Sequence, residues 1–164
     1  MADKFQGSVV PVEQGFLNYV LREPVGVVGQ IVPWNFPLMC TSWKMGPALA
    51  AGNTVVLKPS EQTPLTALKL GELLAEIFPA GVVNIVTGER KALLKTLAEH
   101  DDVDALWVFG SKADAAMAEK LSAGNLKRML TDHGLATDWY DPAQAEGPIL
   151  LRHAVQVKNI WIPY

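Results

Sequence analysis

The sequence predicts an α/β fold, a doubly wound parallel sheet with a small antiparallel sheet beside it. Apolar runs of strand length alternate with segments of helical spacing from residue 25 to about residue 134. Two of these runs end in polar loops, PWNFP at 33–37 and KPSE at 58–61. Because ligands bind at the carboxyl ends of parallel strands, we expect these two loops to contribute to a binding site.

The first third of the chain predicts a hairpin, a buried strand and a helix. Residues 9–12 and 16–21 form strand patterns on either side of a short turn at 13–15. The nearly continuous β-branched run at 25–32 indicates a strand that is covered on both faces. A helix follows Pro37, and Pro47 is expected to bend or break it.

Alternating strands and helices continue to residue 134. Thr63 is a suitable N-cap for a helix that starts with a proline, and Ser111 is a candidate cap for a later helix. Gly88 precedes another helical segment. The strands predicted in this part of the chain are 54–57, 82–86, 103–109 and 126–130.

The domain organisation follows from these patterns. Residues 25–134 form the predicted parallel-sheet domain, and 135–153 form a polar connection with one helical turn. The stretch 154–162 alternates with period two and should be a half-exposed strand. The segments 1–24 and 154–164 therefore supply the strands of the small sheet.

Composition excludes several functional classes. The 164 residues carry a net charge of −3, which gives no basic surface for nucleic acid or an anionic membrane. No apolar run reaches the roughly 18 residues of a membrane span, and MADKFQGSVV has no apolar signal core. Cys40 is the single cysteine, and the three histidines have no metal-ligand spacing. We therefore expect a cytoplasmic protein without a metal, a nucleic-acid partner or a membrane partner.

With these residues laid out, the chain resembles the aldehyde dehydrogenase superfamily. PWNFP, WKMGPALAAGNTVVLKPSEQTPLTAL and FPAGVVNIVTG look like its nucleotide-binding half, over roughly residues 22–88. The resemblance implies a Rossmann-like domain, NAD as cofactor and oxidation of an aldehyde to a carboxylic acid. The strands at 8–22 and 154–162 look like the family's oligomerisation strands. They imply a homo-oligomer, or docking to a complete aldehyde dehydrogenase unit through edge strands.

The resemblance also implies a missing domain. The resemblance is continuous to about Gly134 and resumes near His153. Between those two points the family would carry its catalytic domain. The segments NLKRMLTDHG, DWYDPAQAEG and QVKNIWIPY resemble something narrower, the truncated second unit of the sixteenth aldehyde dehydrogenase family. We therefore expect a truncated module that is catalytically silent alone.

Cofactor-binding residues are implied by the same resemblance. Lys58 and Glu61 match the family pair at the adenosine ribose, where a carboxylate favours NAD over NADP. An arbitrary KPSE loop would instead carry two ordinary surface charges. In the phosphate loop, VFGSKADA departs from the family pattern FTGSTxVG, since Asp114 adds a negative charge and Ala115 replaces a glycine. NAD binding is therefore expected to be weak, through Pro33, Trp34, Lys58, Glu61, Gly88, Gly110 and Ser111.

Catalytic positions are only partly represented. Asn35 matches the family's oxyanion donor, although an asparagine between two prolines also suits a turn. Asp132 lies at the general-base position, in TDHG where the family reads LELGG. Cys40 lies in a helical apolar segment, where a lone cysteine is usually a small buried hydrophobe. The nucleophile of the family is therefore absent from its expected place.

Three hypotheses remain open from the sequence. The first is a silent aldehyde-dehydrogenase-like module that keeps the dinucleotide fold and the assembly strands. The second is the nucleotide-binding part of an active NAD-dependent enzyme that another segment or chain completes. The third is an oligomerisation domain without nucleotide binding.

Overall fold

The structure is a computed structural model that describes residues 6–133, 138, 140–145 and 149–164. Its main feature is a parallel sheet of five strands in the order β5-β4-β3-β6-β7. These strands are β3 (Val27–Ile31), β4 (Thr54–Lys58), β5 (Val83–Ile85), β6 (Ala105–Val108) and β7 (Arg128–Thr131). The side chains of the three central strands are mostly apolar and buried, since helices cover both faces of the sheet.

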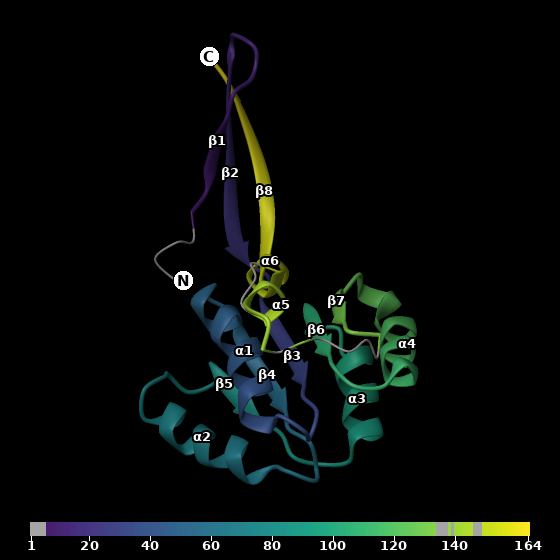
Figure 1. Cartoon of the computed structure of the whole chain (residues 1–164). Coiled ribbons are helices and arrows are strands. Elements are labelled where there is room, and N and C mark those ends of the chain that lie inside the picture. The colour runs from purple at the N-terminus through teal and green to yellow at the C-terminus, as the bar shows by residue number, and fades with distance from the viewer. Residues whose placement is uncertain (1–5, 134–137, 139, 146–148) are drawn as a thin grey trace.

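Two pairs of helices cover the two faces, which confirms the doubly wound prediction (Figure 1). The helices α1 (Pro37–Ala50) and α2 (Leu65–Ala75) pack on one face, and α3 (Arg90–Glu99) and α4 (Lys112–Leu121) pack on the other. Alternate side chains of β6 point to opposite faces of the sheet and pack under different helices. Trp107 joins the core under α1, and Leu106 joins the core under α3 and α4.

The strand order creates a switch point between β3 and β6. From β3 the chain moves outward through β4 to β5, and then returns across the sheet to place β6 against the other side of β3. The loops that leave the carboxyl ends of β3 and β6 therefore run in opposite directions. In open parallel sheets, this divergence leaves a crevice in which ligands bind.

A second sheet projects from the main body as a three-stranded arm (Figure 1). The arm consists of β1 (Ser8–Val10), β2 (Phe16–Pro24) and β8 (Val155–Pro163), all antiparallel. Every residue of β2 pairs with β8, and the buried Asn18 donates its amide to Asn159 at 2.7 Å. Before β8, the structure has two short helices, α5 (Pro142–Ala145) and α6 (Ile149–His153).

One buried side chain joins the arm to the main body. Asn53 accepts a hydrogen bond from the backbone N–H of Gly26 at 2.9 Å. Its amide donates to the carbonyls of Ala48 at 2.9 Å and Ala154 at 2.8 Å. The entry to β3, the end of α1 and the residue before β8 therefore meet at Asn53.

Two local predictions were wrong, and a third was wrong in part. Pro47 does not break its helix, which continues to Ala50 because Met45 and Ala48 on both sides of the proline are held in the core. Thr63 does not cap α2, since its N–H is bonded to Ser60 in a turn and Pro64 occupies the cap position. The last strand of the parallel sheet begins at Arg128 rather than Leu126, whose left-handed φ of 56° is incompatible with a strand.

Some predictions stay open. The boundaries of the predicted domains are not tested, and residues 1–5, 134–137, 139 and 146–148 lie outside the described residues. Among the described residues, no helix is long and apolar enough to cross a membrane. The same part of the chain contains no group of three His, Cys, Asp or Glu side chains placed to hold a metal ion.

Candidate functional site

A pocket of about 410 Å³ opens at the switch point of the parallel sheet. Its walls come from the loops after β3, β4 and β6 and from the first turns of α3 and α4. The pocket gathers most of the cofactor residues expected from the sequence. It is lined by Pro33, Trp34, Asn35, Ser60, Glu61, Gln62, Arg90, Gly110, Ser111 and Asp114.

A buried lysine orients the carboxylate on one side of this pocket. The ammonium of Lys58 is fully buried at the end of β4 and donates to Glu61 at 2.5 Å, whose side chain is 46% exposed. This hydrogen bond is the largest of the effects that lower the pKa of the Glu61 carboxyl, and the backbone N–H groups of Glu61 and Arg90 add to it. Lys58 does not itself line the pocket, so it acts by holding Glu61 ionised and in place.

The opposite side of the pocket holds an ion pair that the sequence did not reveal. Nε of Arg90 donates to Asp114 at 2.8 Å, and Nη2 donates to the carbonyl of Phe109 at 3.1 Å. Burial opposes the ionisation of Asp114, but the hydrogen bond and charge of Arg90 outweigh it and keep the pKa of Asp114 below its usual value. The negative charge expected near the phosphates is therefore paired.

The turn from β6 into α4 brings backbone groups to the pocket. Ser111 caps α4, since its hydroxyl accepts the N–H of Asp114 at 3.1 Å. The N–H of Gly110 donates to the carboxylate of Asp132 at 3.2 Å. Gly88 belongs to the loop before α3 and is not among the residues that line the pocket. Trp34 and Asn35 are exposed at the pocket rim.

A second group of side chains lies behind the turn at Gly110. Lys44 is buried in α1, with its ammonium 3.8 Å from the centre of the Phe109 ring. Burial lowers the pKa of Lys44 to about 8, and the charges of Cys40 and Asp132 act in the opposite direction. Burial also raises the pKa of the Cys40 thiol. The sequence alone gives no sign that Lys44 is buried, because a lysine inside an amphipathic helix usually faces water.

The candidate catalytic residues are not brought into one pocket. Asn35 lines the pocket at the switch point, whereas Asp132 lines a neighbouring cavity of about 170 Å³. Cys40 is 1% exposed and lines neither of them. In this structure the expected oxyanion donor, the general-base position and the thiol therefore do not face a common space.

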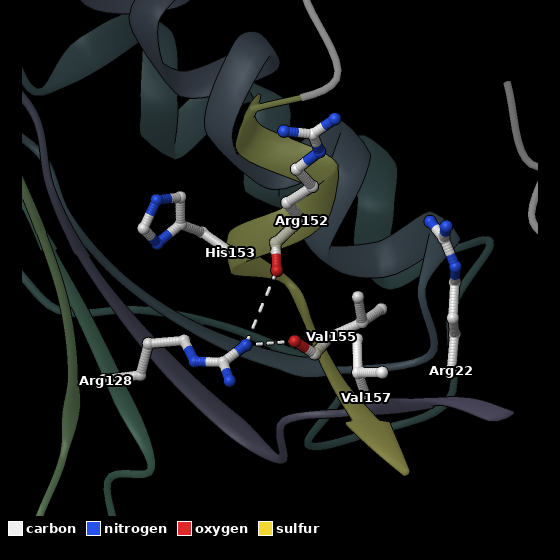
Figure 2. A pocket seen from close by; sticks show the side chains of 6 residues that line it. All are labelled: Arg22, Arg128, Arg152, His153, Val155 and Val157. Carbon is white, nitrogen blue, oxygen red and sulfur yellow. Dashed lines mark hydrogen bonds between the residues drawn. The ribbon is translucent and has the colours of Figure 1, made fainter. Parts of the chain in front are cut away.

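Another cavity lies at the foot of the arm and contains three arginines (Figure 2). Its volume is about 470 Å³, and Arg22, Arg128, Arg152 and His153 line it with two valines. Arg128 donates to the carbonyls of Val155 and Arg152, while Arg22 and Arg152 extend in other directions. Burial and the charge of Arg128 lower the pKa of His153. The arginines do not converge on one point, and Arg128 fastens β7 to the start of β8.

Comparison with known proteins decides the family. The sequence profile of the aldehyde dehydrogenase family matches residues 1–136 of the 164. The chain belongs to the aldehyde dehydrogenase family. Aldehyde dehydrogenase 1A1 of Bos taurus is 50% identical over 135 residues, which are 81% of this chain and 27% of that protein. The mitochondrial aldehyde dehydrogenase of Homo sapiens is 48% identical over 136 residues, 81% of this chain and 26% of that protein.

Solved aldehyde dehydrogenase structures agree with this assignment. A putative aldehyde dehydrogenase from Burkholderia cenocepacia is 64% identical, with a TM-score of 0.78, over 80% of this chain and 27% of that one. PnpE in complex with nicotinamide adenine dinucleotide is 59% identical, with the same TM-score and coverage. The chain thus spans about a quarter of the length of the relatives that it matches, and this quarter includes the pocket at the switch point.

Proposed function

We propose that this chain is a dinucleotide-binding module of the aldehyde dehydrogenase family that binds NAD weakly, prefers it to NADP and does not oxidise aldehydes by itself. The observation that carries the proposal is the pocket at the switch point. It combines an oriented carboxylate, Glu61, with the Gly110-Ser111 turn at the start of α4. A solved relative in complex with NAD supports the choice of cofactor.

The residues of the pocket fit the ribose of a dinucleotide well and its pyrophosphate less well. Glu61 is ionised and can accept the ribose hydroxyls, and its charge repels the additional phosphate of NADP. Ser111 and the first turn of α4 supply the helix N-terminus that favours a pyrophosphate. Arg90 and Asp114 occupy part of that space, which accounts for weak binding. When bound, NAD would supply the hydride acceptor.

Cofactor preference tests this proposal. Because the charge of Glu61 faces the position of the NADP phosphate, calorimetric titration should show about tenfold tighter binding of NAD than of NADP. Glu61→Gln should remove most of this difference, since the carboxamide carries no charge. Glu13→Gln, in the turn of the arm, is the matched control and should leave the preference unchanged. Equal affinities for the two cofactors in the unaltered chain would contradict the role of Glu61.

The chain lacks an activated thiolate. The aldehyde oxidation that the family resemblance implies needs a thiolate that attacks the aldehyde, an oxyanion donor and a carboxylate that activates water. Asn35 can donate an amide hydrogen bond and Asp132 can accept a proton. However, the single cysteine is buried, its pKa is raised, and it therefore stays a thiol at neutral pH.

Purified chain should accordingly produce no NADH from NAD and a panel of aldehydes. The expected rate is that of the buffer, and Cys40→Ala should not change it. Steady turnover that Cys40→Ala abolishes would contradict this prediction and identify Cys40 as a nucleophile. Turnover that appears only after a catalytic segment from another chain is added would instead support the second hypothesis, a module of an active enzyme. A cytoplasmic location stays a prediction.

The arm favours an additional role in assembly. Its exposed surface is rich in large apolar side chains, namely Val9, Phe16, Leu17, Leu21, Val157, Trp161 and Ile162. Surfaces of this kind on a sheet with an open edge are typical of protein–protein contacts. We propose that the arm pairs with a second copy of the chain or with a complete family member.

Substitution in the arm should disturb this assembly. Val157 is 63% exposed. Val157→Lys should raise the dissociation constant of the assembly at least about tenfold, because a charge would be buried in the contact. Analytical ultracentrifugation should therefore show a shift towards the monomer. Leu65→Lys adds the same charge at a 77% exposed position on α2 and should have no such effect. A strictly monomeric wild-type chain at all concentrations would exclude self-association through the arm.

A further inference from the structure

The side chain of Arg90 lies directly over the turn that enters α4. A Cβ atom placed on Gly110 would be 2.2 Å from Nη2 of Arg90, so only glycine leaves room for the guanidinium in this position. The side chain is held there from two sides, by Asp114 and by the carbonyl of Phe109. The pair is largely withdrawn from solvent, with 19% exposure for Arg90 and 17% for Asp114.

The position of the pair coincides with the phosphate end of the proposed NAD site. Asp114 is the third residue of α4, and its N–H is the one that Ser111 caps. Both members of the pair line the pocket together with Gly110 and Ser111. A pyrophosphate at the start of α4 would therefore be attracted by Arg90 and repelled by Asp114.

We propose that Asp114 is an internal competitor for the dinucleotide phosphates, and that Arg90 exchanges Asp114 for the pyrophosphate when NAD binds. The inference rests on the proposed function and assigns the weak affinity to one pair of residues. Arg90 is the first residue of α3. Its guanidinium has five N–H donors, and the described contacts use two of them.

The exchange predicts effects of opposite sign for the two partners. Without the charge of Asp114, Arg90 is free to bind the pyrophosphate and nothing repels it, so affinity rises. Without Arg90, the charge of Asp114 faces the phosphates alone, so affinity falls. If the ion pair only supported the structure of the pocket, loss of either partner would weaken binding.

The test is calorimetric titration of the full chain with NAD and with adenosine, which has no phosphate. Asp114→Asn should tighten NAD binding about tenfold, and Arg90→Met should weaken it about tenfold, as expected for gain or loss of one charge-assisted contact. Adenosine should bind all three proteins within a factor of two. The affinity of Asp114→Asn for NAD should also fall more steeply with salt than that of the unaltered chain.

The outcomes separate this inference from the proposed function. The unaltered chain could bind NAD while Asp114→Asn weakens that binding or leaves it unchanged. This result would overturn the exchange and leave the proposed function intact. Binding of neither ligand to any of the proteins would overturn both, because Asp114→Asn is expected to bring affinity into range. Circular dichroism checks the folding of each variant, and Arg90→Gln carries the same expectation if Arg90→Met is unstable.

Discussion

Asn53→Ala should lower the free energy of unfolding by about 3 kcal/mol, because the substitution removes three hydrogen bonds, two of them buried, worth about 1 kcal/mol each. The N–H of Gly26 loses its acceptor in a partly buried position. Since Asn53 is 2% exposed, water cannot easily replace the lost partners. The effect should be large for a residue of this size, as Asn53 contacts three separate segments of the chain.

Urea denaturation followed by tryptophan fluorescence measures this change. Asn84→Ala is the matched control, because Asn84 also donates to two carbonyls, Val55 at 3.3 Å and Gly81 at 2.8 Å, but from a more exposed position. It should cost less than about 1 kcal/mol. Similar losses for the two variants would show that Asn53 has no special role at the junction.

A pH-dependent stability is the second large effect, and Lys44 causes it. The pKa of Lys44 is lowered to about 8 in the folded chain from an ordinary value of 10.5, chiefly by burial. Between these two values the unfolded chain binds more protons than the folded chain, so stability should rise with pH. The unfavourable burial of the charge acts fully below pH 8 and is relieved as pH rises towards 10.5.

Comparison with Lys44→Met isolates this contribution. The difference in free energy of unfolding, wild type minus variant, should increase by about 2 kcal/mol between pH 7 and pH 10. Groups that both proteins share and that lie away from Lys44 cancel in this difference. Lys69→Met, at a lysine whose side chain is 71% exposed, should show a flat difference. A flat profile for Lys44→Met as well would mean that its ammonium is solvated.

Much of the fold could be predicted because the central strands carry a strong signal. Residues 25–32 and 103–109 are almost continuously apolar, and a run of that kind is soluble only when both faces are covered. Once the sheet is parallel, the loops after its strands must meet at one edge. For this reason Asn35 and Glu61 could be placed near one another before their contacts were known, and the family resemblance added Gly110.

Contacts between distant side chains could not be predicted in the same way. Arg90 and Asp114 are separated by 24 residues and start two different helices, and no local pattern indicates that they meet. Lys44 resembles any solvent-facing lysine until Phe109 covers it. The backbone chemistry of Pro47 predicts a bend or a break, whereas tertiary packing keeps its helix continuous to Ala50.

The pairing of β2 with β8 has a consequence for the order of folding. Asn18 and Asn159 are 141 residues apart in the chain, so this ladder closes a very long loop, whose entropic cost falls when the intervening segment has already become compact. The parallel sheet should therefore form first and bring the two ends of the loop together. Until then, the apolar side chains of β2 have only the short β1 beside them, and they are exposed to pairing with other chains during that interval.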